Sequence, residues 1–165
     1  MSADLSDSTN ISGFAKGYGG ASDKGFYEKK SNTKSPLFPQ GITEFTNAGM
    51  MAGAATVNFS AKPYESFSGF YGAVSTYGSF SYLKYGPLRL FSQLAQDSEL
   101  KVGKIIWVVG HSGPETAEDS RTHYGIFAPG VTQLFPNGSI INIHPWEHNE
   151  VAPSLTAALK IDVPL

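Results

Sequence analysis

Two groups of side chains in this sequence could carry out proton chemistry. One is a single acid, Glu44, which stands directly before residues 45–55, a stretch of mostly small and apolar side chains without any charge. The other is the polar segment after the apolar run KIIWVVG (104–110), which holds His111, Glu115, Glu118, Asp119, Arg121 and His123. Histidine exchanges protons near neutral pH, and an apolar pocket favours the protonated form of a carboxyl group. Both groups are therefore candidates for general acid–base catalysis.

Strands and helices alternate along the part of the chain that must position these residues. The run 104–110 is rich in β-branched residues and is typical of a parallel strand buried on both faces. The other expected strands cover 62–66, 139–145 and a last segment from Ile161. The expected helices run from Thr43 to about Asn58, over 127–134 and over 147–160, the last capped by Asn149 or a neighbour. A further helical region is expected over 67–97, broken near Gly86 and Pro87. This alternation predicts an α/β fold with a parallel sheet, whose ligand groups lie at the carboxyl ends of its strands.

The composition limits the kinds of partner. The chain has 165 residues, which fits one domain, and its net charge of −2 gives no indication of nucleic acid or an anionic membrane as a partner. No apolar run approaches the roughly 20 residues of a membrane span, and the first ten residues lack the basic and apolar regions of a signal peptide. The absence of cysteine excludes disulfides and thiol catalysis, and it fits a reducing compartment such as the cytoplasm.

The chain is poor in charge and rich in aromatic residues. Residues 1–40 are polar and predicted to be largely irregular, whereas residues 41–165 form the expected α/β core. Only 16% of all residues are charged, against about 25% in a typical soluble domain, and 13% are aromatic. Because the centres of large interfaces are depleted in charge and enriched in aromatic residues, we expect a partner to cover part of the surface.

One alternative is a serine hydrolase with Ser112 as its nucleophile. The sequence WVVGHSGP places this serine after a strand, as in a nucleophile elbow. The elbow requires glycine two residues after the serine because the turn is sterically crowded, and Pro114 stands there instead. The match to this class of enzyme is therefore partial, and the chain is short for that fold.

A second alternative is a metal site formed by His144 and His148, with Glu147 between them. The spacing resembles that of a zinc-binding helix, in which two histidines one turn apart share a face. Pro145 and the strand expected before it interrupt such a helix, so the two rings need not share a face. Structural roles are favoured for these residues, and no metal ligand is assigned.

Five segments of the sequence resemble, in collinear order, the pyrimidine-binding domain of the transketolase family. They are SADLSDS, GITEFTNAGMMAGAA, PYESFSGF, VVGHSGPETAEDSRTH and IINIHPWEHNE. The family has a Gly-Ile-x-Glu helix start, a Phe-x-x-Phe pair, a strand ending in His, a Glu-Asp-x-x-Thr-His motif and a later strand before an Asn-Glu pair. The resemblance spans nearly the whole chain and implies a three-layer α/β sandwich with a mostly parallel sheet. The family places a strand directly before Ser-Ala-Asp-Leu, and we expect that first strand to be missing here.

The resemblance implies a thiamine diphosphate enzyme that transfers two-carbon ketol units between sugar phosphates. Glu44 matches the acid that hydrogen-bonds the aminopyrimidine N1′ and promotes its imino tautomer. The resemblance implies four further cofactor-binding residues: Asp4, Leu5, Phe67 and Phe70. Of these, Phe67 and Phe70 form an aromatic pair around the pyrimidine. Two catalytic histidines of the substrate channel correspond to His111 and His123. The implied substrate-binding residues are Ser8, His111, Asp119 and His123.

Several positions depart from the family pattern. Phe45 stands where the family has His, Thr43 replaces an Arg, Ser120 and Arg121 replace Gly-Pro, and Tyr124 replaces a Gln. These differences bear on the donor and acceptor sugars more than on the cofactor. A dihydroxyacetone synthase or another transketolase-like enzyme is an equal alternative.

The resemblance also implies a partner. The diphosphate-binding domain of the family carries a Gly-Asp-Gly signature and holds Mg²⁺ (or Ca²⁺), and that signature does not occur in this sequence. In the family the active site lies between the two domain types, usually across a subunit interface. We therefore expect this chain to work in a homo- or hetero-oligomer, as one part of a split enzyme or as a fragment, and to be inactive alone. The alternative is a non-catalytic assembly or regulatory subunit that kept the fold.

Overall fold

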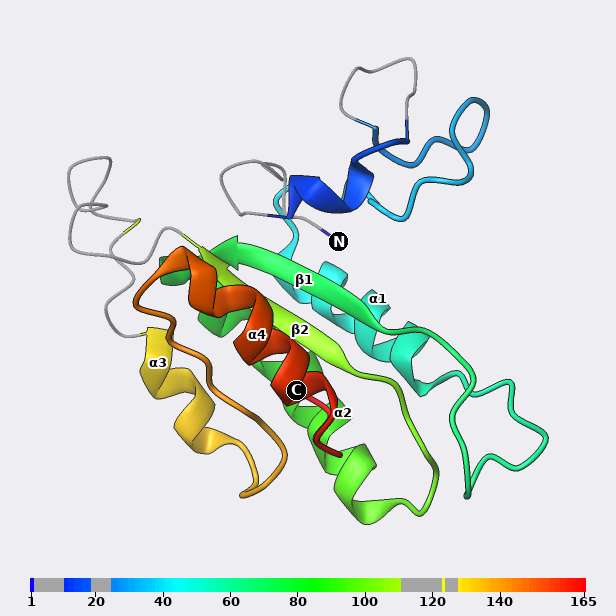
Figure 1. Ribbon diagram of the computed structural model, residues 1–165, viewed down its shortest axis with the longest axis vertical. Coiled ribbons are helices and arrows are strands. Elements are labelled where there is room, and N and C mark those ends of the chain that lie inside the picture. Colours follow the sequence, from blue (N-terminus) through cyan, green and yellow to red (C-terminus); the bar gives the residue numbers. More distant parts are fainter. Residues whose placement is uncertain (2–10, 19–24, 111–122, 124–127) are drawn as a thin grey trace.

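The computed structural model describes residues 1, 11–18, 25–110, 123 and 128–165 (Figure 1). In this part of the chain the sheet consists of two parallel strands, β1 (Gly72–Tyr77) and β2 (Ile105–Gly110), with Gly72 opposite Ile105 and Tyr77 opposite Gly110. The predictions of an α/β fold and of a parallel strand over 104–110 are therefore confirmed.

The helices of the described chain lie before, between and after the two strands. The α-helices are α1 (Glu44–Thr56), α2 (Tyr85–Asp97), α3 (Ala128–Val131) and α4 (His148–Leu159), and the 3₁₀ helices are η1 (Ser12–Ala15), η2 (Gly78–Lys84) and η5 (Thr132–Leu134). The helices predicted over 43–58, 127–134 and 147–160 are confirmed to within one or two residues where they are described. Helix α4 is capped by Glu147, whose side chain forms a capping box with Glu150.

Helix α1 packs closely against β1, where Gly72 leaves room for the Met51 side chain. The buried residues of α1 recur at helical spacing and form one face: Glu44, Asn47, Ala48, Met51 and Ala55. Alternate residues of β1 share a face of the sheet, so Gly72, Val74 and Thr76 point the same way. A Cβ atom at Gly72 would lie only 2.1 Å from Met51 Sδ, so a larger residue here would force the Met51 side chain to shift. The close approach brings the start of α1 to the carboxyl end of β1.

The main hydrophobic core lies between α1, α2 and the two strands. Its buried members come from both helices, both strands and the segment after η5: Ala48, Met51, Ala55, Val74, Leu88, Phe91, Ile105 and Phe135. Trp107 adds its ring against Phe135, with ring centroids 6.1 Å apart. Helix α4 crosses in front of β2 in Figure 1, and none of its residues is buried.

Single backbone hydrogen bonds extend the sheet beyond its two strands. On the β2 side, Ile105 N donates to Pro164 O and Ile141 N donates to Leu165 O, both at 2.9 Å. On the β1 side, Ser75 N donates to Met1 O at 3.2 Å. The strands predicted over 139–145 and from Ile161 are not formed. In their place, these two segments make the single backbone hydrogen bonds given above.

Two further predictions were wrong. Residues 62–66 form a turn rather than a strand, because Asn58 Nδ2 donates to Pro63 O, Ser66 O and Lys101 O and holds the loop closed. The region 67–97 is not helical throughout, since it contains β1 and η2 before α2. No break occurs at Gly86 and Pro87, because Pro87 lies in the first turn of α2, where a missing N–H costs no hydrogen bond.

The described part of residues 1–40 contains η1 and is otherwise without a helix or strand. Ile11, Ala15 and Leu37 form a small hydrophobic cluster against which Phe26 and Val108 of β2 pack. No helix in the described ranges is long and apolar enough to cross a membrane.

Candidate functional site

Glu44 is a buried acid at the carboxyl end of the sheet. It is the first residue of α1, and its side chain is only 6% exposed. Thr76 Oγ1 donates a hydrogen bond to Glu44 Oε1 at 3.0 Å. Glu44 Oε2 accepts no hydrogen bond from the described residues. The N-terminal end of a helix stabilises a negative charge, and the hydrogen bond from Thr76 orients this carboxyl group.

The alternation of β1 explains why Thr76 meets Glu44. Thr76 lies on the same strand face as Gly72 and Val74, which pack against α1, and it lies one residue before the end of the strand. Its hydroxyl group is the polar end of an otherwise apolar contact between β1 and α1. A buried hydroxyl needs a partner, and Glu44 supplies it.

A buried lysine lies beside this acid. Lys84, the last residue of η2, is completely buried, and its Nζ donates a hydrogen bond to Asn47 Oδ1. Burial lowers the pKa of Lys84 to about 8, and the charge of Glu44 opposes this lowering. Asn47 is itself completely buried one helical turn after Glu44. The polar groups of α1, β1 and η2 thus converge within the hydrophobic core.

Three aromatic rings contact one another at the carboxyl end of β1. Tyr77 ends the strand and Phe80 lies in η2, with ring centroids 6.4 Å apart. The ring of His123 meets both edge-on, at 5.1 Å from Tyr77 and 5.7 Å from Phe80. Of the two histidines assigned to the substrate channel, His123 thus lies close to the residue that follows Thr76.

Sequence reasoning missed Tyr77, Phe80 and Lys84. The available signal was the segment TYGSF (76–80), in which two aromatic residues three positions apart flank a glycine. The sequence predicts a helical region over 67–97, and this prediction hides the end of a strand there. A strand assigned to 72–77 would have placed this segment at the carboxyl end of a parallel sheet, where ligand groups are expected.

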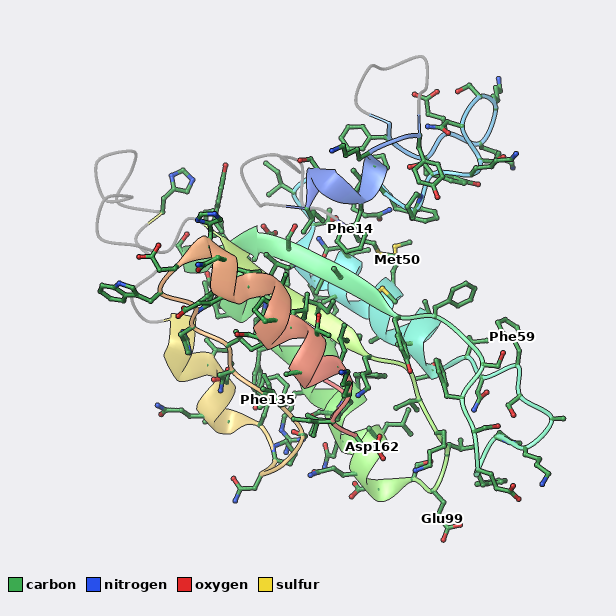
Figure 2. All side chains as sticks on the ribbon, in the orientation of Figure 1. Phe14, Met50, Phe59, Glu99, Phe135 and Asp162 are labelled. Atoms are coloured by element: carbon green, nitrogen blue, oxygen red, sulfur yellow. The ribbon has the colours of Figure 1, made fainter. Side chains whose placement is uncertain are left out.

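Phe67 and Phe70 lie away from Glu44. Both precede β1 and therefore lie at its amino end, whereas Thr76 and Glu44 lie at its carboxyl end. The ring of Phe67 stacks on Tyr71 at 5.4 Å, and Phe70 meets Phe59 edge-on at 5.8 Å. Figure 2 shows Phe59 beyond the C-terminal end of α1, the opposite end from Glu44. The structure does not bring this aromatic pair to the acid that it was expected to accompany.

Several predicted site residues lie outside the described residues: Asp4, Leu5, Ser8, His111, Asp119 and the alternative nucleophile Ser112. The segment that holds His111 and Asp119 begins directly after Gly110, which ends β2 opposite Tyr77. Their assignment to the site stays a prediction.

The alternative metal site is not supported by the described residues. Glu147 and Glu150 are occupied by the capping box of α4, and no group of three potential metal ligands occurs in the ranges that the structure describes. An open hollow of about 680 Å³ lies between residues 142–145 and the first turns of α4. Neither Glu44 nor Thr76 lines it, so it is separate from the buried acid.

Comparison with known proteins gives one match. A family model described as transketolase, pyrimidine binding domain, matches residues 1–165, which is the entire sequence. Searches of curated proteins and of solved structures return no match to this chain.

Proposed function

Because this chain belongs to the family of transketolase pyrimidine-binding domains, we propose that it is the pyrimidine-binding part of a transketolase-like enzyme. In the proposed reaction, two-carbon ketol units pass between sugar phosphates with thiamine diphosphate as cofactor. The observation that carries the proposal is the buried carboxyl group of Glu44, with Oε1 held by Thr76 and Oε2 left for a ligand.

The residues around Glu44 fit an aminopyrimidine ring. Such a ring is flat and carries nitrogen atoms at its edge, so it needs an acid in its plane and apolar or aromatic groups at its faces. Glu44 offers the acid, and the rings of Tyr77 and Phe80 contact each other at the same end of β1, with Tyr77 on the strand face opposite Thr76. We assign the ring nitrogen N1′ to Glu44 Oε2. When bound, thiamine diphosphate supplies the nucleophilic carbon that carries the two-carbon unit.

Burial prepares Glu44 for proton exchange with the ring. A carboxyl group shielded from water keeps a stronger interaction with the proton that it shares, because the surrounding dielectric constant is low. Thr76 fixes the orientation of the carboxyl plane, so that its second oxygen is presented without reorganisation. In the proposal Glu44 alternately accepts a proton at Oε2 and returns it to the ring nitrogen.

The remaining site residues are assigned by position in the family. His123 stands against Tyr77 and Phe80, which supports its placement in the substrate channel. We retain His111, Asp119 and Ser8 as substrate-binding residues and Asp4 and Leu5 as cofactor-binding residues. The diphosphate and its Mg²⁺ (or Ca²⁺) are assigned to a diphosphate-binding domain, because no Gly-Asp-Gly occurs in residues 1–165.

Reconstitution tests this function. The chain is mixed with a transketolase diphosphate-binding domain, thiamine diphosphate and Mg²⁺, and ketol transfer between sugar phosphates is measured. We expect activity in the mixture and none in the chain alone. Glu44→Gln should lower kcat at least about 100-fold, as expected for a general acid–base residue. The matched control is Glu65→Gln, since Glu65 forms an exposed ion pair with Lys62.

The outcomes separate an enzyme from an assembly subunit. An active mixture that Glu44→Gln leaves unchanged would contradict the role of Glu44. Formation of a complex that binds no thiamine diphosphate would support a non-catalytic subunit. Turnover by the isolated chain would contradict the requirement for a partner domain.

A further inference from the structure

The pairing of Lys84 with Asn47 is the most unusual polar contact in the described core. Lysine is almost never fully buried unless its ammonium group has a partner. Lys84 is completely buried, and its Nζ donates to Asn47 Oδ1, which is a neutral acceptor. A neutral amide does not balance a positive charge, so the contact alone does not explain why a cation lies here.

Glu44 lies next to this contact. Asn47 follows Glu44 by three residues on α1, and side chains at this spacing are neighbours on one helix face. Lys84 and Glu44 do not form a direct ion pair, and the charge of Glu44 nevertheless raises the affinity of Lys84 for its proton. The two opposite charges therefore act on each other inside the core, with the amide of Asn47 beside both.

The geometry of the amide follows from the chemistry of the ammonium group. An ammonium group only donates hydrogen bonds, so Asn47 must present its oxygen to Lys84. Its Nδ2 is then a buried donor, and it has no hydrogen-bond partner among the described residues. Asn47 thus has its acceptor engaged by a cation while its spare donor lies on the helix face that carries Glu44.

Resting on the proposed function, we propose that Lys84 is a positioning residue for Glu44. Its ammonium group, fixed by Asn47, balances the charge of the buried carboxylate while Thr76 orients it. Glu44 then exchanges its proton with the bound ring as one half of a neutral pair, rather than as an isolated negative charge within the core. Lys84 touches neither the ring nor the substrate in this arrangement.

Other charged groups near Lys84 do not replace it. The amino group of Met1 donates to Ala73 O at 2.7 Å, and burial and the charge of Lys84 lower its pKa to about 6. At neutral pH this amine is therefore mostly uncharged, whereas Lys84 is mostly protonated. Glu44 on α1 is the anion whose charge acts on Lys84 within the described part of the chain.

Nuclear magnetic resonance of the chain without cofactor tests the pair directly. The Lys84 ¹³Cε signal, assigned with Lys84→Met, is followed between about pH 6 and pH 11. We expect a midpoint near 8 in the wild type. Glu44→Gln should lower this midpoint by about one unit or more, a tenfold change in proton affinity. Glu65→Gln, the control at an exposed acid, should leave it unchanged.

The wild type alone supplies a second measurement if Glu44→Gln does not fold. The Glu44 ¹³Cδ signal should shift at the same midpoint as Lys84 ¹³Cε, because the carboxylate senses the loss of the neighbouring charge. The interaction between Lys84 and Glu44 would be contradicted by a Lys84 midpoint that is the same in Glu44→Gln and in the wild type. It would also be contradicted by a Glu44 signal that does not shift at this midpoint.

The assembled enzyme tests the positioning role. Ketol transfer should fall as pH rises through about 8, and Lys84→Met should lower activity and abolish that decline. A decline that persists in Lys84→Met would overturn the role. If no mixture binds thiamine diphosphate although Lys84 responds to Glu44, the proposed function fails while the charge pair stands. If the mixture is active but the Lys84 midpoint is unchanged in Glu44→Gln, only the role of Lys84 fails and the proposed function stands.

Discussion

Thr76 Oγ1 donates to Glu44 Oε1 at 3.0 Å, and both side chains are buried. This bond connects the carboxyl end of β1 to the first residue of α1. It is the one hydrogen bond that the described residues make to the carboxyl group of Glu44. The orientation of this carboxyl group therefore depends on the register between α1 and β1.

Replacing Thr76 by valine should misorient Glu44. The substitution keeps the side-chain shape and removes the donor, which costs about 1–3 kcal/mol when the partner stays buried. We expect thermal unfolding at a lower temperature and about tenfold lower kcat in the reconstituted enzyme, with complex formation unchanged. The control is Thr56→Val, since the Thr56 hydroxyl donates to Gly53 O at an exposed site. Full activity of Thr76→Val would show that Glu44 is oriented by other contacts.

The close approach of α1 to β1 gives a second prediction, at Gly72. A methyl group at this position would overlap Met51 Sδ, so Gly72→Ala should lower the free energy of unfolding by about 1–3 kcal/mol through overpacking. Gly53→Ala is the matched control, because its Cβ would meet nothing within 4 Å. In that helical position alanine should stabilise the protein by up to about 1 kcal/mol. Urea unfolding of both variants measures the difference, and equal effects would contradict this packing.

The burial of Lys84 predicts how stability depends on pH. Its pKa falls from 10.5 in the unfolded chain to about 8 in the fold. Between these values the unfolded chain binds a proton that the folded chain does not, so the free energy of unfolding should rise with pH. Below pH 8 both states are protonated and the cost of burying the charge is present in full. The total change is about 3 kcal/mol.

Urea unfolding at several pH values measures this dependence. Lys84→Met should lose the rise between about pH 8 and pH 10, because it has no amine to titrate. Lys62→Met should retain the rise, since Lys62 is exposed and its ion pair with Glu65 lies at the surface. If the free energy of unfolding rises equally with pH in Lys84→Met and in the wild type, the rise comes from groups other than Lys84.

The sequence was sufficient for the class of fold and for the helix that begins at Glu44, but not for the aromatic residues at the carboxyl end of β1. The β-branched run that became β2 and the uncharged helix after Glu44 are strong local signals. The strand β1 was missed because GAVSTY has glycine, alanine and serine at positions that pack against α1 and other segments. Its pattern is set by close packing rather than by large hydrophobic residues. Lys84 was missed for a related reason, since a lysine in a sequence is expected at the surface.

The two aromatic pairs make different predictions for cofactor binding. Stacking on a flat ring is worth about 0.5–1.5 kcal/mol beyond the buried area, and in the proposed site it comes from rings at the end of β1 where Glu44 lies. Tyr77→Leu and Phe80→Leu should therefore weaken thiamine diphosphate binding to the reconstituted enzyme by about tenfold. Phe67→Leu and Phe70→Leu should change the free energy of unfolding with little effect on affinity, because their rings pack on Tyr71 and Phe59. Calorimetric titration of the four variants decides between the pairs, and a larger loss of affinity in Phe67→Leu or Phe70→Leu would restore these residues to the cofactor site.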